Sequence, residues 1–547
     1  MIRKVTKNSL FTVVMLIILA FVVTFTAFYP GRPFLSWDGI FHMSRFTQIA
    51  ESLKHFQLPA MVSFIGGNNN MNAMTSMYPW ISNLFVIIPM MFLQPVIAIA
   101  VGILLINIIT AINSYLMMRY LTNNRVYRFL GVTLYLCNSY HLIDLYAKFD
   151  FGEVTAYAFL PLIVLGLFYI WDDRKNGMII LSLGIIGVAN AHLLSLFFTI
   201  IVIALIEFCR ICIKKITVNE LKSFVLAALL SFLGSMFSLL QMAYISVHNS
   251  LYTPSKGWNQ VILTESFNDM IGNQFHEYFG TWNLGIVMST IIIFLVGKLV
   301  FSKNKVRSWD RYTVVILVLL LLFYNIFPVG NLMTRTFMGL LQYPGRLFIL
   351  VVILVIIAFT KYCNAKHIDN MRIFILMMLA IMTACGSISS YSNTRYDNSR
   401  RGTYPLTSKD FNRVLNTKTG LMDYVPKAMF NEYLSKDKSS RDVRIHKVVG
   451  NYKKAEYRVL TKNAGEKKLP LAYINGVRYL VNVNNKTEKP KANQGQMTVY
   501  LRKGNNLVRI SSITSDLWYV IFGISMVTIF FLTIYGLRKL YRDILIS

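Results

Sequence analysis

Long apolar runs dominate the pattern of hydrophobic and polar positions along this chain. Many are close to 20 residues long, the length of helix that crosses the roughly 30 Å hydrocarbon core of a bilayer. Such runs predict an α-helical polytopic membrane protein. We expect twelve spans near residues 10–28, 96–118, 126–142, 154–171, 178–192, 194–212, 224–245, 284–302, 312–328, 341–361, 372–388 and 517–537.

The apolar run at residues 78–93 does not fit an ordinary crossing. It is short, begins Tyr-Pro-Trp and contains Pro89. A crossing here would also place the basic loop 119–128 on the outer side of the membrane. We therefore expect an interfacial or re-entrant helix, with thirteen spans as the alternative.

Basic residues in the short loops set the expected orientation. The chain has 547 residues, 55% of them hydrophobic and 15% charged, with a formal net charge of +30. An excess of this size in a soluble protein would suggest nucleic-acid binding. Here much of it lies beside the spans, as cytoplasmic loops require, so no nucleic-acid partner is expected. The positive-inside rule, by which basic loops lie in the cytoplasm, places both termini there.

Three longer segments then face the outside, at residues 29–77, 246–283 and 389–515. The last alternates polar and apolar residues over 473–483 and 497–510, with Gly and Asn turns, which predicts strands. We expect a small extracytoplasmic β-sandwich-like domain, followed by a C-terminal transmembrane helix and short tail at 516–547. Its many Lys and Arg residues suit an anionic neighbour such as lipid headgroups or a wall polymer, or reflect composition without a specific partner.

The first group of candidate site residues follows the first span. Asp38, His42 and Arg45 are spaced i, i+4 and i+7, which puts them on one face of a helix. The carboxylate is a candidate general base, or a metal ligand together with the imidazole. The alternative is an N-cap aspartate that begins an ordinary amphipathic surface helix.

A second group lies between the spans 126–142 and 154–171. Tyr146, Lys148 and Glu153 crowd a short loop there, together with Asp150. Glu153 is a candidate second acid or ligand for a substrate hydroxyl. Its alternative role is to complement the dipole at the start of the next helix.

Two further motifs carry polar residues at the ends of spans. His192, between two short spans, is a candidate ligand or a helix–helix hydrogen-bonding residue. Gln342 and Arg346 belong to Gln-Tyr-Pro-Gly-Arg, where a span begins. The guanidinium suits a phosphate, and the alternative is snorkelling to a lipid headgroup.

Together these motifs resemble a family of bacterial membrane proteins, the 6-pyruvoyl-tetrahydropterin-synthase-related or YfhO-like proteins, and more broadly the GT-C glycosyltransferases. The resemblance covers nearly the whole chain. It rests on Asp38-(3)-His42-(2)-Arg45, Gly152-Glu153 with the later Pro161, Ala191-His192-Leu-Leu-Ser and Gln342-Tyr-Pro-Gly-Arg346-Leu.

The resemblance implies a GT-C-like transmembrane domain over residues 1–388 and a β-rich domain over 389–515. It also implies transfer of a sugar from a polyprenyl-phosphate donor to a cell-envelope glycopolymer or glycolipid, at the outer face of the cell membrane. Asp38 would act as the base, and Arg346, Lys148 and Arg45 would stabilise the leaving phosphate. Glu153 and His42 would orient the acceptor or hold a divalent cation.

The chain departs from the family pattern at two positions. The leading His-Asp of the signature is Trp37-Asp38 here, which removes one metal ligand. The usual aromatic residue before the arginine is Gly345, which loosens the expected donor site. No Walker A motif and no Rossmann glycine pattern is present, as a lipid-linked donor would allow. A lipid-saccharide flippase or a non-enzymatic polymer-binding protein is the alternative function.

Overall fold

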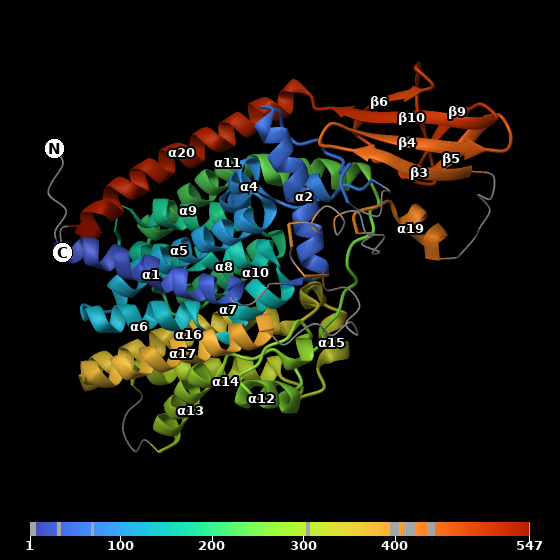
Figure 1. Cartoon of the computed structure of the whole chain (residues 1–547). Helices are drawn as coiled ribbons and strands as arrows, with labels where there is room; N and C mark the ends of the chain where they lie inside the picture. Colours follow the sequence, from blue (N-terminus) through green and yellow to red (C-terminus); the bar gives the residue numbers. More distant parts are fainter. Residues whose placement is uncertain are drawn as a thin grey trace.

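The computed structural model shows a bundle of helices with a β region at one end (Figure 1). It describes residues 7–29, 34–66, 71–174, 176–301, 307–393, 404–405, 407–408, 411, 415, 423–434 and 443–545. The basic start at residues 1–6, the end of the tail at 546–547, and parts of the predicted outer segments 29–77 and 389–515 lie outside these residues.

Helices make up most of the described chain, and they follow the apolar runs closely. They are α1 (Lys7–Phe28), α2 (Trp37–Lys54), α3 (Met74–Met77), α4 (Leu84–Phe92), α5 (Pro95–Leu121), α6 (Arg125–Leu136), α7 (Ser139–Leu142), α8 (Phe151–Trp171), α9 (Gly177–Ala189), α10 (Leu193–Cys212), α11 (Val218–His248), α12 (Leu263–Ile271), α13 (Ile286–Val300), α14 (Ser308–Phe323), α15 (Gly330–Thr334), α16 (Phe348–Lys366), α17 (Asn370–Asn393), α19 (Lys427–Leu434) and α20 (Asp516–Leu545).

Eight helices of the described chain are long and apolar enough to cross a membrane, namely α1, α5, α8, α10, α11, α16, α17 and α20. This finding supports the predicted multi-pass membrane protein. The other four predicted spans correspond to the shorter helices α6, α9, α13 and α14. The full count of twelve therefore stays a prediction.

The run at residues 78–93 forms a short helix, as predicted. Its apolar helical part, Ile81–Phe92, is shorter than the helices that qualify as spans. A helix of this length extends only about 18 Å, well below the hydrocarbon thickness. It packs against α5, where Gly102 lies directly against Val86.

The C-terminal β region consists of two antiparallel sheets, which confirms the strands predicted from the alternating pattern. One sheet has the order β3-β4-β10-β6-β7 and the other β5-β9-β8. The strands are β3 (Val443–Gly450), β4 (Lys454–Thr461), β5 (Gly465–Ala472), β6 (Arg478–Val483), β7 (Lys486–Glu488), β8 (Lys491–Asn493), β9 (Gln496–Leu501) and β10 (Gly504–Ile513). Buried residues of β4 alternate with exposed ones, so this strand contributes one face to a core.

The β strands and the end of α20 lie at opposite ends of the molecule (Figure 1). The start of α1 lies at the same end as the end of α20. A two-residue strand after α1, β1 (Phe34–Leu35), pairs with β2 (Tyr404–Pro405), from the segment that follows α17. Segments far apart in the sequence therefore meet at the end of the bundle that carries the β region.

Candidate functional site

Two segments place the predicted site residues next to each other. One is the start of α2, and the other is the turn η3 (Ile143–Lys148), which has π-helical geometry, with the start of α8. The hydroxyl of Ser36 joins them, because it accepts from the backbone N–H of Gly39 and donates to the carbonyl of Lys148. Phe149 follows with φ of 56°, an unusual conformation for a bulky side chain. A π-turn and a left-handed phenylalanine in sequence are typical of a functional site.

Lys148 is the centre of a buried ionic cluster. Its Nζ lies 2.7 Å from Asp144 Oδ1, 2.7 Å from Glu153 Oε2 and 3.8 Å from Asp150 Oδ2. The ring of Trp282 covers it, with the centroid 4.9 Å from Nζ. Burial lowers the pKa of Lys148, but the nearby carboxylates raise it more, so the amine stays charged.

Asp150 ties the cluster to α8 and to α2. Its Oδ1 caps α8 by accepting from the backbone N–H groups of Gly152 and Glu153, each at 3.1 Å. The same oxygen lies 3.1 Å from Nε2 of His42. Burial alone would raise the pKa of Asp150, yet the hydrogen bond from His42 and the charge of Lys148 hold it well below its usual value. Asp150 is therefore an anion that organises both segments.

His42 and Arg45 lie on one face of α2, as their spacing predicts, but that face is buried. Arg45 donates to Nδ1 of His42 from Nε at 3.2 Å, and to the carbonyls of Tyr78 and Pro79 at 3.1 and 3.0 Å. Because Nδ1 accepts, Nε2 of His42 carries the proton and donates to Asp150. Burial and the charge of Arg45 lower the pKa of His42 to about 4, so the ring is neutral at physiological pH.

These contacts give Arg45 a structural role. Its guanidinium is fully buried between the rings of Phe46 and Tyr78, 4.6 and 4.4 Å from their centroids. It is not accessible to a substrate phosphate. The expected contribution of Arg45 to phosphate stabilisation is therefore not supported by the geometry.

Asp38 does not take part in the hydrogen bonds and ion pairs that connect Lys148, Asp150 and His42. It is half-buried on the first turn of α2 and, within the described part of the chain, has neither a hydrogen bond nor an ion pair. Burial and the charge of Asp150 raise the pKa of its carboxyl to about 6, against the opposing effects of Lys148 and Arg346. A free carboxylate with such a pKa is suited to accept a proton near neutral pH.

Glu153 and Arg346 meet beside the lysine. Glu153 Oε1 accepts from the hydroxyl of Tyr140 at 2.8 Å, and its Oε2 lies 3.4 Å from Nε of Arg346. Arg346 also reaches the carbonyl of Leu341 at 3.3 Å and Oε1 of Gln342 at 3.4 Å. All of these Arg346 contacts are longer than a typical N–H···O hydrogen bond. The guanidinium is therefore weakly satisfied inside the protein.

A narrow cleft with about 50 Å³ of space begins at this arginine. Its polar end is formed by Glu153, His192, Ser195 and Arg346. The rest is lined by apolar side chains of α8, α10 and α16, among them Leu160, Leu194, Phe198, Val202 and Leu350. α10 itself is almost entirely unburied, with Phe198 as its one buried residue, so the cleft lies beside a surface suited to lipid.

Of the remaining predicted residues, His192 and Gln342 lie at or beside the cleft, and Tyr146 does not. His192 lines the cleft and its Nδ1 lies 2.7 Å from the hydroxyl of Ser195. Gln342 supports Arg346 and donates to the carbonyl of Ser255 at 3.0 Å. Tyr146 points away, because its buried hydroxyl donates to the carbonyl of Val23 in α1. The structure therefore separates Tyr146 from the site.

Tyr78 and Tyr424 are site residues that the sequence did not identify. The hydroxyl of Tyr78 lies 3.4 Å from Asp150 Oδ1, and its ring stacks on His192. The ring centroid of Tyr424 lies 6.1 Å from that of Phe41. Burial raises the pKa of Tyr424, and the charges of Asp150 and Asp38 add to this effect. The Tyr-Pro-Trp motif at the start of the run 78–93 is the one sequence feature that marks Tyr78 as unusual. Tyr424 comes from a segment with no motif.

The donor set does not favour a metal ion shared by Asp38 and His42. Both ring nitrogens of His42 are in hydrogen bonds, and among the described residues Asp38 is not a partner of either. Across the part of the chain that the structure describes, no group of three or more His, Cys, Asp or Glu side chains is arranged to hold a metal ion.

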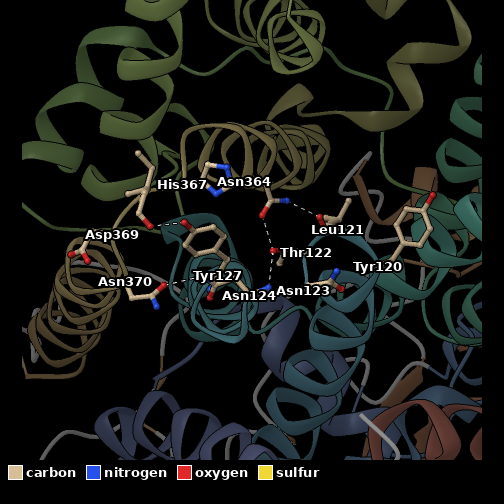
Figure 2. Close-up of a pocket in the computed structure, with 11 residues that line it drawn as sticks. Tyr120, Leu121, Thr122, Asn123, Asn124, Tyr127, Asn364, His367, Asp369 and Asn370 are labelled. Carbon is tan, nitrogen blue, oxygen red and sulfur yellow. Dashed lines mark hydrogen bonds between the residues drawn. The ribbon is translucent and has the colours of Figure 1, made fainter.

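A second cavity, of about 540 Å³, lies between the α5–α6 and α16–α17 loops (Figure 2). Its polar side chains bond to each other across the two loops. Thr122 donates to Asn364 at 2.8 Å, and Asn124 donates to Asn370 at 2.9 Å. None of the predicted site residues lines it. These hydrogen bonds link the α5–α6 loop to the α16–α17 region, and we interpret them as structural.

Comparisons of the chain with protein-family models, with curated proteins and with solved structures give no match. The family resemblance of the motifs therefore remains a prediction, and the function must be argued from the site itself.

Proposed function

We propose that this chain is a GT-C-type membrane glycosyltransferase. It transfers a sugar from a polyprenyl-phosphate donor to a hydroxyl of a cell-envelope glycopolymer or glycolipid. The observation that carries the proposal is the cleft at Arg346, which combines a weakly satisfied guanidinium with an apolar wall beside α10. A lipid phosphate needs a cation for its headgroup and, next to it, an apolar surface for its hydrocarbon chain.

The donor would bind with its phosphate at the polar end of the cleft. Arg346 offers planar donors to phosphate oxygens, and His192 lies at the same end. The isoprenoid chain would follow the apolar side chains of α10 and α16. Ion pairing with Glu153 orients Arg346 before the donor arrives, so Glu153 acts as a positioning residue.

Asp38 is the proposed base. Its carboxylate accepts the proton of the acceptor hydroxyl as that oxygen forms a bond to the anomeric carbon. The bond between the anomeric carbon and the phosphate oxygen breaks, and the polyprenyl phosphate leaves with the electron pair. Arg346 stabilises the negative charge on the departing phosphate.

We place the reaction at the outer face, with both termini in the cytoplasm and the β region outside. Two observations support this orientation. The starts of α2 and α8 carry the site, and the external segments meet at the end of the bundle that carries the β region. The end of α20 lies at the opposite end.

A photoreactive polyprenyl phosphate tests the donor site. With the purified full chain, we expect light-dependent crosslinks to α10 and α16, and at least a tenfold loss of crosslinking in Arg346→Ala. Arg335→Ala is the matched control, because this exposed arginine lies outside the cleft. Equal crosslinking of Arg346→Ala and wild type would contradict the donor site.

Asp38→Asn tests the reaction. In cells that depend on this chain, we expect the variant to stop sugar incorporation into the envelope polymer and to accumulate unused lipid-linked sugar. Glu51→Gln, a carboxylate later on the same helix α2, should leave incorporation unchanged. Normal incorporation by a normally expressed Asp38→Asn chain would rule out the enzyme and favour a flippase or a polymer-binding protein.

A further inference from the structure

One face of the C-terminal β region carries a line of arginines. We propose that this face, shared by the neighbouring strands β3, β4, β10 and β6, is a docking surface for a linear polyanion of the cell envelope. Docking there requires the proposed orientation, with the β region outside the membrane, but it does not require sugar transfer. The face is also separate from the cleft at Arg346.

The register of the five-stranded sheet identifies the side chains on this outer face. Buried residues of β4 alternate with exposed or half-buried ones, and the second set forms the outer face. Residues directly opposite each other on paired strands share a face, which extends the assignment to β3, β10 and β6. Among the described side chains of this face, the charged groups are one carboxylate, that of Glu456, and five cations, those of Arg444, Lys454, Arg458, Arg478 and Arg509.

Four of the cations form a diagonal line, with one arginine on each of the four strands. Arg444, Arg458 and Arg509 lie on three neighbouring strands, each displaced from the last by two residues in the register. Arg478 of β6 continues the line four residues farther on. Strand spacing and rise per residue put the first three roughly 8 Å apart. Guanidinium groups bind anionic oxygens through paired N–H groups, so such a line fits a chain of repeated anionic groups better than one compact anion.

The arginines of this line are accessible to a ligand. Arg444, Arg458 and Arg478 are exposed, and none of them has an ion pair within the described part of the chain. The side chain of Arg509 is 41% exposed, and its Nε lies 3.5 Å from Oε1 of Glu456. One carboxylate therefore stands against the whole line of cations, which leaves a strongly positive surface.

The strands of the sheet extend away from the helical bundle (Figure 1). The near end of the β region contacts two helices of the bundle. In the turn between β3 and β4, the ring of Tyr452 stacks on His55, directly after α2, with centroids 4.6 Å apart. The carbonyl of Gly476, before β6, accepts from the hydroxyl of Tyr244 in α11. The other end of the sheet therefore projects outward.

This projection decides between a polymer and the lipid headgroups of the surrounding bilayer. Arg458 and Arg444 lie six and eight residues along the register from Ile513, where β10 ends shortly before α20. At about 3.3 Å per residue, these separations are roughly 20 and 26 Å. Both are more than twice the Debye length of about 8 Å at physiological salt. Headgroups beside α20 are too distant to neutralise these two arginines, whereas an extended polymer can follow the whole line.

Binding of inorganic polyphosphate to the full chain in zwitterionic nanodiscs tests the proposal. We expect Arg444→Gln combined with Arg458→Gln to lower the affinity about tenfold, because two cations of the line are lost. The thermal midpoint should not change, because both side chains are exposed. Glu456→Gln should instead raise the affinity about threefold, because it removes the carboxylate that opposes the line. If the double variant is not obtained folded, an unchanged affinity in Glu456→Gln alone overturns the proposal.

A charge-matched control separates the face from the net charge of the chain. Lys489→Gln combined with Lys491→Gln removes two exposed cations beyond β7, at the far edge of the sheet, and should leave the affinity nearly unchanged. Equal losses in the two double variants would attribute binding to the overall positive charge and overturn the proposal.

Phosphatidylglycerol vesicles provide the second arm of the experiment. If they capture wild type through Arg444 and Arg458 more tightly than polyphosphate does, the face binds lipid and the proposal is wrong. All of these measurements use the chain without a sugar donor. Their failure is therefore distinguishable from failure of donor crosslinking at Arg346 or of sugar transfer.

Discussion

At the scale of single residues, we expect the proposed base Asp38 to couple activity to stability through one proton. Its carboxyl has a pKa of about 6 in the folded chain, compared with 3.8 for the free side chain. A base must be ionised, so we expect the transfer rate to rise between pH 5 and pH 7. Initial rates of the purified chain at a series of pH values, with a lipid-linked sugar donor, measure this.

The stability should change in the opposite direction. The folded chain binds the Asp38 proton more tightly than the unfolded chain, so stability falls as the pH rises from 3.8 through about 6. Asp38→Asn removes a penalty of up to about 3 kcal/mol at pH 7. We expect the variant to be inactive and to have a raised thermal midpoint at pH 7. A lowered midpoint would show that the ionised carboxylate stabilises the fold.

Arg45 should matter for stability rather than for phosphate binding. Arg45→Ala leaves the carbonyls of Tyr78 and Pro79 and Nδ1 of His42 without donors in a buried site. Each buried acceptor left without a donor costs roughly 1–3 kcal/mol. The thermal midpoint should fall, and donor crosslinking of the folded fraction should remain. Lys54→Ala, at the end of the same helix, should change neither.

Spacing along the chain predicted part of this residue-scale picture. The i and i+3 positions correctly placed His42 and Arg45 on one face of α2. Spacing does not tell which neighbour covers that face, and the carbonyls of Tyr78 and Pro79 come from another segment. The same limit applies to Tyr146, which lies in the π-helical turn η3 and donates its hydroxyl to the carbonyl of Val23 in α1.

At the scale of elements, close contact between α8 and α9 depends on glycine. A Cβ added to Gly166 would lie 2.5 Å from the backbone nitrogen of Leu181 and 2.6 Å from its Cα. A backbone cannot move aside as a side chain can, so Gly166→Ala must push the helices apart. We expect a loss of about 1–3 kcal/mol in the free energy of unfolding, measured as a lower thermal midpoint.

Gly297→Ala is the matched control for that prediction. Gly297 lies within α13, and an added Cβ would meet nothing within 4 Å. Alanine is preferred over glycine inside a helix by about 0.5–1 kcal/mol. The control should therefore equal or exceed wild type in stability. Equal losses for Gly166→Ala and Gly297→Ala would contradict the close-packing argument.

Element identity was well predicted from the sequence because it depends on local pattern. The apolar runs correspond to helices, and the alternating stretches at 473–483 and 497–510 overlap β6, β9 and β10. Helix lengths were predicted less well. The run at 126–142 divides into α6 and α7, because Asn138 caps a new helix by accepting from the backbone N–H of His141.

At the scale of the whole molecule, the predicted orientation is open to direct measurement. In a cysteine-free chain, Gln494→Cys in the β8–β9 turn should react with a membrane-impermeant maleimide in intact cells. His367→Cys, in the α16–α17 loop, should react only after permeabilisation. Both positions are exposed, so access depends on the side of the membrane. The reverse pattern would invert the proposed topology.

Tyr424 shows how segments outside the main bundle complete the site. Its backbone N–H donates to the carbonyl of Tyr252, and its carbonyl accepts from the N–H of Ala73, so three distant segments meet at this residue. Its φ is 61°, a costly conformation for an aromatic residue and one held by these contacts. No pattern along the chain predicts such pairing, because each partner lies in an irregular segment.

The Tyr424 hydroxyl has no hydrogen bond in the described structure, and the residue lies near Asp38, which also has none. We expect the acceptor hydroxyl to bind between these two groups. We expect Tyr424→Phe to raise the KM for the acceptor about tenfold, the equivalent of one hydrogen bond of about 1.4 kcal/mol. The thermal midpoint and donor crosslinking should stay at wild-type values.

Tyr500→Phe is the control, because this tyrosine is 51% exposed on β9 and lies in the β region. It should leave the acceptor KM unchanged. An unchanged KM in Tyr424→Phe would remove the hydroxyl from the acceptor site. A fall in kcat at unchanged KM would instead assign Tyr424 to the reaction step beside Asp38. Because the ring and backbone contacts survive in phenylalanine, either result reports on the hydroxyl rather than on the folding of the strained segment.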